Sequence, residues 1–273
     1  MWPPTSSHFD RWIADLEARH LADLTFSEVS RGLRALSSAY VERRGRLSDG
    51  GALSGAGKRA AFALFYGPLH YLLVREIVRQ LPAADPPIPS IVDLGCGTGA
   101  AGAAWAETWE KGVGRGFRRD DAENPSRPLF PKIVGIDRHP WAVQEAARTY
   151  AAFGRQFRTR QADVSSTPLP TSPSGFVAAF TVNELQDAAR DRLLTRLLER
   201  ARGGHRLLIV EPIARAMTPW WDAWRAAIVA AGGRADEWRF PANLPPIVAR
   251  LDRAAGLDHR ELTARSLIIN WER

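Results

Sequence analysis

A short apolar segment that runs into a glycine-rich turn constrains this chain more than any other feature. Residues 90–94 are mostly apolar, with Asp93 among them, and glycines follow at Gly95, Gly97 and Gly99. A run of apolar residues is typical of a strand buried on both faces of a parallel sheet. Glycine permits tight turns and leaves room for a ligand beside the backbone. The segment therefore predicts a buried strand, a ligand-binding turn and a helix directly after it.

Strands and helices alternate along the rest of the chain. Further strands are predicted at residues 132–137, 157–164, 175–182, 205–211 and 261–269, and helices at 100–109, 142–153, 187–202, 220–231 and 245–255. This alternation favours an α/β fold with an open, doubly wound, mostly parallel sheet and helices on both faces. In such sheets a ligand binds beyond the carboxyl ends of the strands.

The part of the chain before the glycine turn is predicted to be helical. Apolar residues recur at helical spacing over residues 8–45 and 60–81, with a bend expected at Gly67-Pro68. Gly- and Ser-rich residues 48–57 and the proline-rich connector at 82–89 are predicted to be loops. We therefore expect an N-terminal helical region, residues 1–85, and an α/β ligand-binding domain, residues 86–273.

Composition narrows the classes of protein and of partner. The net charge is +7, and arginine supplies most of the positive charge, which favours contact with phosphates or acidic surfaces. Codon bias toward arginine is the alternative explanation. The single cysteine, Cys96, excludes an intramolecular disulfide and a multi-cysteine metal site, and we expect no metal. The sequence shows no secretory signal and no membrane-spanning run, so we expect a cytoplasmic protein without a membrane partner.

Two acids stand at the ends of the second and third predicted strands. Asp137 ends the second strand, where its carboxylate can accept hydrogen bonds from both hydroxyls of a ribose. It lies 38 residues after Gly99, whereas about 20 is usual in nucleotide-binding folds. A polar insertion at residues 111–131 accounts for the excess. Asp163 stands at the end of the third predicted strand. The alternatives are a surface acid for Asp137 and a solvated turn residue for Asp163.

Polar residues also interrupt the apolar run after the fourth strand. Asn183 and Glu184 stand where the lip of a cleft is expected, and we take them as candidate catalytic residues. The alternative is that Asn183 or Asp187 caps the following helix. Glu211 ends the fifth strand at the same edge, and its role is open. His139 is either part of the ligand pocket or a solvated loop residue.

The spacing of Gly95, Gly97 and Gly99, with Asp93 before them and Asp137 after the next strand, resembles the class I S-adenosylmethionine (SAM)-dependent methyltransferases. It is tighter than the Gly-x-Gly-x-x-Gly of dinucleotide-binding loops. The resemblance implies SAM as the cofactor, held by the glycine turn. It places Asp93 near the methionine end, partly through water, and Asp137 at the ribose. It further implies that Asp163 binds the adenine amino group and that Asn183 and Glu184 face the methyl group and its acceptor.

Residues 60–269 also resemble a narrower group, the methyltransferase-like family of the mitochondrial small ribosomal subunit and its bacterial relatives. The resemblance rests on the order of short motifs: a helical segment with Tyr66 and Tyr71, Val182-Asn183-Glu184-Leu185, Leu207-Leu208-Ile209-Val210-Glu211-Pro212, Asp236-Glu237-Trp238-Arg239-Phe240 and Leu244-Pro245. Many members hold an iron–sulfur cluster with cysteines near the tail motif. This chain has none there, so the cluster is not carried over.

Three functions follow as hypotheses. The first is a methyltransferase that acts on ribosomal RNA or in assembly of the small ribosomal subunit. The basic charge supports it, and so do Arg155, Arg158 and Arg160 near the third strand. A solvated strand edge is the alternative explanation for these arginines. The second is a methyltransferase for a small-molecule acceptor, with the N-terminal helices as a lid. In that case Trp220, Trp221 and Trp224 line the pocket or simply pack in the core. The third is a SAM-binding assembly factor without catalysis.

Overall fold

The computed structural model describes residues 6–42, 53–81, 88–112 and 130–270. The predicted insertion at residues 111–131 therefore lies outside the described residues except at its two ends. The same holds for residues 48–52 of the predicted loop at 48–57 and for residues 82–87 of the connector at 82–89.

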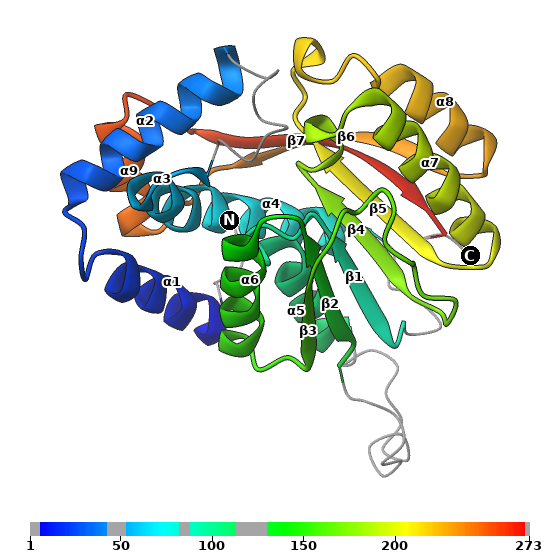
Figure 1. The fold of residues 1–273 in the computed structure, drawn as a ribbon, viewed down its shortest axis with the longest axis horizontal. Coiled ribbons are helices and arrows are strands. Elements are labelled where there is room, and N and C mark those ends of the chain that lie inside the picture. The colour runs from blue at the N-terminus through cyan, green and yellow to red at the C-terminus, as the bar shows by residue number, and fades with distance from the viewer. Residues whose placement is uncertain (1–5, 43–52, 82–87, 113–129, 271–273) are drawn as a thin grey trace.

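A seven-stranded sheet forms the centre of the molecule (Figure 1). Its strands are β1 (Ser90–Leu94), β2 (Lys132–Asp137), β3 (Phe157–Gln161), β4 (Gly175–Ala179), β5 (Arg206–Glu211), β6 (Arg234–Pro241) and β7 (Glu261–Ile269). They lie in the order β3-β2-β1-β4-β5-β7-β6. The first five pair in parallel, and β7 is antiparallel to both β5 and β6. Strand order reverses beside β1, so the prediction of a doubly wound, mostly parallel α/β sheet is confirmed.

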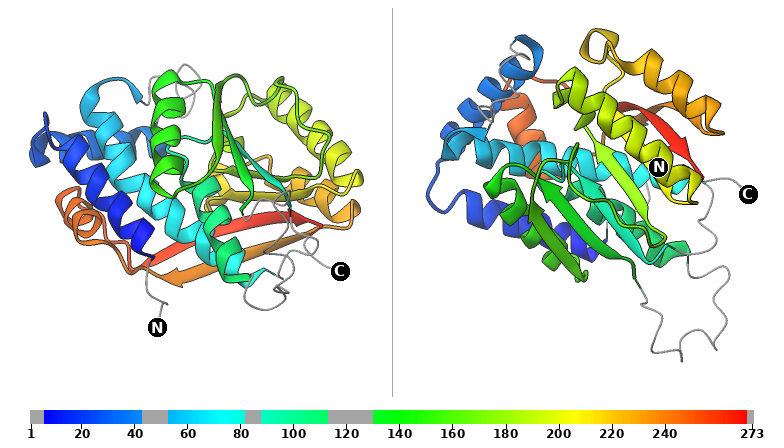
Figure 2. Two further views of the ribbon diagram at one scale, coloured as in Figure 1. Left: turned by 90° about the horizontal axis from the view of Figure 1, so that it is seen from below. Right: turned by 45° about the vertical axis from the view of Figure 1, so that its right-hand side comes forward.

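Helices cover both faces of the sheet (Figure 2). They are α1 (Ser7–His20), α2 (Phe26–Glu42), α3 (Ala56–Ala61), α4 (Gly67–Gln80), α5 (Ala100–Gly112), α6 (Pro140–Ala152), α7 (Asp187–Arg202), α8 (Trp221–Ala230) and α9 (Pro246–Ala254), with a π-helical turn, Phe62–Tyr66, between α3 and α4. Among the described residues, no helix is both long and apolar enough to cross a membrane.

Alternate residues of each central strand enter different cores. In β5, Leu208 and Val210 belong to the cluster shared with α4 and α5, whereas Leu207 and Ile209 belong to the cluster shared with α7 and α8. All four are at most 1% exposed. Side chains alternate across a strand, and helices cover both faces, so the central positions of the strand are apolar on both sides. This explains why the sequence predicted the buried strands so directly.

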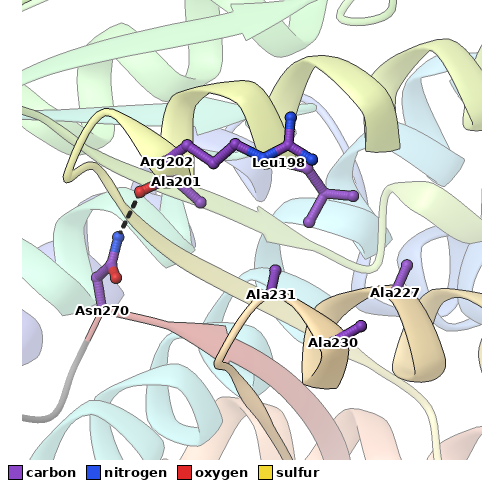
Figure 3. Close-up of a pocket in the computed structure, with 7 residues that line it drawn as sticks. All are labelled: Leu198, Ala201, Arg202, Ala227, Ala230, Ala231 and Asn270. Carbon is purple, nitrogen blue, oxygen red and sulfur yellow. Dashed lines mark hydrogen bonds between the residues drawn. The ribbon is translucent and has the colours of Figure 1, made fainter.

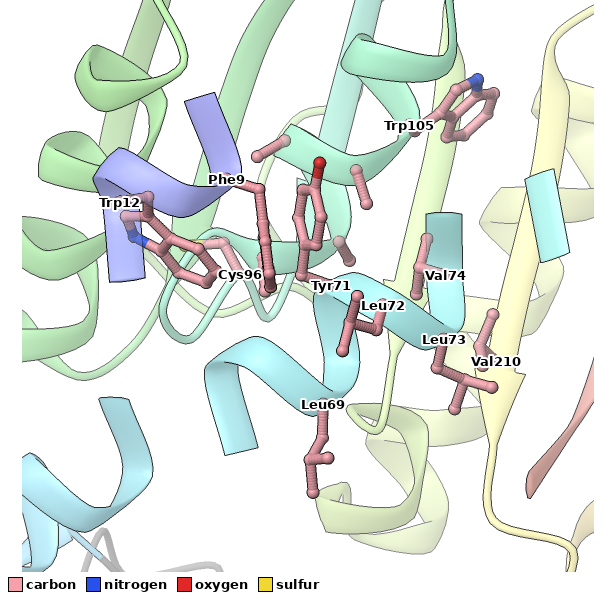
Figure 4. Packing of buried hydrophobic residues seen from close by; sticks show 14 of the residues in the cluster. Phe9, Trp12, Leu69, Tyr71, Leu72, Leu73, Val74, Cys96, Trp105 and Val210 are labelled. Carbon is pink, nitrogen blue, oxygen red and sulfur yellow. The ribbon is translucent and has the colours of Figure 1, made fainter. Parts of the chain in front are cut away.

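The N-terminal helices share the first of these cores. Phe9 and Trp12 of α1 pack with Tyr71 of α4 in the aromatic part of the cluster (Figure 4). The indole of Trp12 donates a hydrogen bond to Thr149 of α6 at 3.1 Å. Arg19 adds an ion pair with the buried Glu145, also on α6, at 2.7 Å. These contacts hold α1 against the helices that flank β2 and β3.

Several boundaries differ from the predictions. The helix predicted over residues 8–45 is two helices, because Thr25 and Glu28 form a capping box that begins α2. The expected bend at Gly67-Pro68 is instead a π-helical turn just before Gly67. Strand β6 was missed, since half of its residues are charged and Pro241 ends it. The third and fourth strands end earlier than predicted, at Gln161 and Ala179.

Candidate functional site

A cavity of about 370 Å³ lies beyond the carboxyl ends of the parallel strands. We call it the central cavity. The loops after β1, β2, β3, β4 and β5 contribute to it, together with the π-helical turn, α4 and Ser37 of α2. Seven of the eight predicted site residues line it: Asp93, Gly95, Gly97, Asp137, Asp163, Asn183 and Glu184. The sheet thus brings together residues that are up to 91 positions apart in sequence.

Gly99, the eighth predicted residue, does not line the cavity. A Cβ on Gly99 would lie 2.9 Å from the Tyr150 ring and 3.0 Å from the Ala146 Cα, so this glycine lets α6 pack against the turn. Gly95 packs against Thr181, on the other side of the turn. Its φ is +67°, and a Cβ there would lie 2.3 Å from Cγ2 of Thr181. The turn is therefore tight because it is packed on both sides, and its remaining glycine, Gly97, faces the cavity.

Asp93 is buried at the base of the cavity. Its Oδ2 accepts hydrogen bonds from the Gly102 amide of α5 and from the Tyr150 hydroxyl, both at 2.8 Å. Burial raises the pKa of Asp93 to about 7, against the effect of these two hydrogen bonds. Asp93 is thus poised to take on a full negative charge when a cation enters the cavity.

Asp137 fixes the glycine turn from the second strand. Its Oδ2 accepts a hydrogen bond from the Gly97 amide at 3.0 Å, and its Oδ1 accepts one from the His139 amide at 2.8 Å. Each carboxylate oxygen retains a lone pair for a further donor. His139 itself lines the cavity and caps α6, because its ring accepts a hydrogen bond from the Trp141 amide. Asp163 likewise lines the cavity, and its Oδ1 accepts a hydrogen bond from the Ser165 amide at 2.7 Å.

Asn183 and Glu184 lie in a 3-10 turn, Val182–Glu184, directly after β4. Neither Asn183 nor Asp187 caps α7, whose N-cap residue is Gln186. Burial, together with repulsion from Asp137, raises the pKa of Glu184 to about 7. At neutral pH this carboxyl group can therefore both accept and release a proton.

Glu211, whose role was open in the sequence, holds this 3-10 turn in place. Its Oε1 accepts hydrogen bonds from the amides of Val182 at 2.9 Å and Asn183 at 3.3 Å. The residue is fully buried, and burial raises its pKa to about 8. Glu211 is a positioning residue, since it does not line the cavity but holds the backbone of the turn that carries Asn183, which does.

Four aromatic side chains that sequence analysis did not assign to the site also line the cavity. We call Phe62, Tyr66, His70 and Phe180 the aromatic wall. His70 stacks on Phe180 with ring centroids 4.1 Å apart and planes 16° apart. Phe62 lies 5.9 Å from Tyr66 and would touch a Cβ on Gly97 at 3.3 Å, so the wall adjoins the glycine turn. Their positions in sequence carry no motif, although Tyr66 was part of the narrower resemblance.

Of the two alternatives for the three tryptophans, packing in the core is the one that the structure shows. Trp220, Trp221 and Trp224 lie in the second core with α7 and are at most 8% exposed. A second, surface pocket lies nearby, between α7 and α8 (Figure 3). There Asn270 donates a hydrogen bond to the Ala201 carbonyl oxygen at 2.8 Å. Alanine and leucine make up most of its lining, with Arg202 as its one charged residue, so it offers little chemistry.

The chain was compared with known proteins. No family model and no curated protein matches it by sequence. Among solved structures, the mitomycin 7-O-methyltransferase MmcR aligns with 94% of this chain and 71% of its own, at 13% identity and a TM-score of 0.49. A TehB-like SAM-dependent methyltransferase from Corynebacterium glutamicum aligns with 74% of this chain and 86% of its own, at 16% identity and a TM-score of 0.41. A putative RNA methyltransferase from Pyrococcus horikoshii aligns with 79% and 85%, at 10% identity and a TM-score of 0.42.

Proposed function

We propose that this protein is a SAM-dependent methyltransferase that binds its cofactor along the glycine turn of the central cavity. The observation that carries the proposal is the negative charge of two carboxylates, Asp137 and Asp93, that bind backbone amides in and after the turn. The amides of Gly97 and Gly102 donate to Asp137 and Asp93, so carboxylates occupy the positions that a bound phosphate would need. A dinucleotide would bring its diphosphate against these acids, whereas SAM is cationic and suits them.

The same residues fit the separate parts of SAM. Asp137 has lone pairs left for two ribose hydroxyls, and Asp93 provides negative charge for the ammonium group of the methionine end. Asp163 lines the cavity and would accept from the adenine amino group, and Gly95 and Gly97 keep the turn free of side chains. When bound, SAM supplies a methyl group activated by a sulfonium centre.

The chain's own task is then to position an acceptor and remove a proton. Methyl transfer is an in-line displacement, in which orientation contributes most to the rate. Asn183 supplies an amide that can orient the acceptor. Glu184, with its pKa near 7, supplies a carboxylate that accepts the proton. Glu211 fixes the backbone of both through the Val182 and Asn183 amides.

Calorimetric titration with SAM, and with NADH as a control, tests the cofactor assignment directly. We expect SAM to bind and NADH to fail. Binding of NADH in preference to SAM would overturn the argument from charge. The absence of binding by either ligand would favour an assembly factor that has lost its cofactor.

Ribosomal RNA is one candidate for the acceptor, in line with the narrower resemblance to the small-subunit family. One observation favours it. Arg158 and Arg160 are both exposed on β3, which is the edge strand of the sheet. If RNA binds along this edge, affinity for a small-subunit RNA fragment will fall with salt, and the double variant Arg158→Gln/Arg160→Gln will reduce the slope by about two phosphate contacts. Methyl incorporation into that RNA then separates an enzyme from an assembly factor without catalysis.

A further inference from the structure

We propose, as a deepening of the methyltransferase function on which it rests, that the acceptor is a free, flat aromatic molecule whose hydroxyl group is methylated. The aromatic wall stacks on its ring, and Glu184 takes the hydroxyl proton. The inference starts from the shape and chemistry of the wall, which no motif in the sequence explained.

The wall is built as a stacking surface. His70 and Phe180 already lie nearly parallel, whereas Tyr66 and Phe62 flank the His70 ring at 6.0 and 6.4 Å with planes tilted by 43° and 83°. Aromatic groups prefer offset-stacked or edge-to-face partners at such distances. A flat ring that enters the cavity thus meets a surface already assembled for it.

Backbone strain supports a dedicated role for Phe180. Its φ is +58°, a left-handed conformation that non-glycine residues seldom adopt and that costs about 1 kcal/mol or more. The Phe180 amide holds this conformation by donating to the Val210 carbonyl oxygen at 2.8 Å. A glycine at this position would avoid the strain, but it would leave His70 without its stacking partner. Strain of this kind is typical of functional sites.

The wall carries no charge at neutral pH. Burial lowers the pKa of His70 to about 3, so its imidazole stays neutral. Burial also raises the pKa of Tyr66 to about 12, so its phenol stays protonated. An uncharged aromatic wall favours an uncharged aromatic ligand over a polar or ionic one.

The charges around the cavity favour a free molecule over a nucleic acid. Four acids line it, Asp93, Asp137, Asp163 and Glu184. Among the described residues of the lining, Arg138 is the one Lys or Arg side chain. A nucleotide strand would bring phosphates that require several basic partners. A free hydroxyaromatic molecule carries no phosphate and requires no basic partners.

A hydroxyl acceptor carries a proton that must leave, and Glu184 is the base that accepts it. As the hydroxyl oxygen attacks the methyl carbon, a carbon–oxygen bond forms and the carbon–sulfur bond breaks, with its electron pair passing to sulfur. The hydroxyl proton passes to the Glu184 carboxylate. The products are a neutral ether, a neutral thioether and a protonated Glu184, so the charge balances. Proton removal by a positioned carboxylate is expected to contribute about 10²- to 10⁴-fold in rate.

The test uses full-length protein saturated with S-adenosylhomocysteine, into which phenol and 2-naphthol are titrated by calorimetry. Decahydro-2-naphthol, the saturated counterpart, is the control ligand. We expect at least one of the two aromatic probes to bind, and the saturated control to bind at least tenfold more weakly than 2-naphthol. Phe180→Leu should weaken 2-naphthol binding by about three- to tenfold, which corresponds to the loss of one aromatic pair.

Two further variants separate stacking from chemistry. Phe240→Leu removes a stacked ring on β6, 6.0 Å from Trp238 and outside the cavity, and should leave 2-naphthol affinity unchanged. Glu184→Gln should retain 2-naphthol binding but lower methyl transfer from SAM to 2-naphthol, measured by mass spectrometry, by at least 100-fold.

The outcomes distinguish this inference from the proposed function. If S-adenosylhomocysteine fails to bind, the methyltransferase proposal falls and the inference falls with it. If it binds but neither aromatic probe does, or the saturated control binds as tightly as 2-naphthol, only the inference is overturned. Displacement of 2-naphthol by a short RNA oligonucleotide would also overturn it, in favour of a nucleobase on the same wall.

Discussion

Gly95→Ala is the most discriminating perturbation of the glycine turn, because the chain contains a matched control. Gly95 and Gly154 have nearly the same backbone angle, with φ of +67° and +63°. A Cβ on Gly154 has nothing within 4 Å, whereas a Cβ on Gly95 would lie 2.3 Å from Cγ2 and 2.4 Å from Oγ1 of Thr181. The two alanine variants therefore share the backbone strain and differ in the steric overlap.

The magnitudes follow from these two contributions. Left-handed backbone at an alanine costs about 1–2 kcal/mol, which is the loss of stability expected for Gly154→Ala. Overpacking adds about 1–3 kcal/mol, so Gly95→Ala should cost about 2–5 kcal/mol in total. Thr181 cannot simply rotate away, since its hydroxyl lies 3.0 Å from the Leu94 carbonyl oxygen and donates to it.

Urea denaturation followed by circular dichroism measures both losses of stability. A double-mutant cycle with Thr181→Ala isolates the overlap, because that change removes the two nearest atoms and leaves Cβ, at 2.8 Å. We expect the double variant Gly95→Ala/Thr181→Ala to be more stable than the sum of the single losses predicts, by about 1–3 kcal/mol. Equal losses for Gly95→Ala and Gly154→Ala, or no coupling with Thr181, would refute the steric account of this turn.

Three further predictions concern the site. Asp137→Ala should weaken SAM binding in calorimetry about 100-fold or more, because two charge-assisted hydrogen bonds of about 1.5–3 kcal/mol each are lost; Asp137→Asn, which keeps one acceptor, should lose less, and wild-type affinity in both would place the ribose elsewhere. SAM affinity should rise as pH increases through about 7, since Asp93, whose pKa burial raises to about 7, must ionise to attract the cation; Asp93→Asn should bind weakly without this dependence, and a flat wild-type profile would argue against contact with Asp93. Burial also raises the pKa of Glu211 to about 8 from an ordinary 4.5, so the folded state binds the extra proton between these values and the free energy of unfolding falls as pH rises across that window. Glu211→Gln should make this fall shallower in urea denaturation at pH 5, 6.5 and 8, and an unchanged slope would count against the buried acid.

Local pattern was sufficient for much of the sheet. The strands β1, β2 and β7 and the helix α7 have the bounds that the sequence predicted. Each is defined by side chains that either enter a core at most positions or repeat at helical spacing, so the information lies within the element itself. Strand β6 could not be predicted in this way, because it is an edge strand that pairs with β7, and its last residues alternate between exposed and partly buried.

The side of the cavity where we propose that the cofactor binds was likewise predictable from the sequence, because its residues lie at strand ends. Parallel strands end at one edge of the sheet, so Asp93, Asp137 and Asp163 had to meet there once the fold was identified. The aromatic wall could not be predicted from strand ends in this way. Phe62, Tyr66 and His70 reach the cavity through a π-helical turn, and Phe180 reaches it through a strained backbone angle. Neither conformation is encoded by a spacing rule.

The sequence by itself determined most strands of the sheet, the glycine turn and the acids at the strand ends, because each depends on residues close together in the chain. The tertiary structure alone decided which residues form the rest of the cavity and how they are held in place. It carried Trp220, Trp221 and Trp224 into the core, gave Glu211 the task of holding Asn183 and Glu184, and placed His70 against Phe180. These outcomes depend on contacts between segments more than 25 residues apart, whose packing is fixed only when both faces of the sheet are covered.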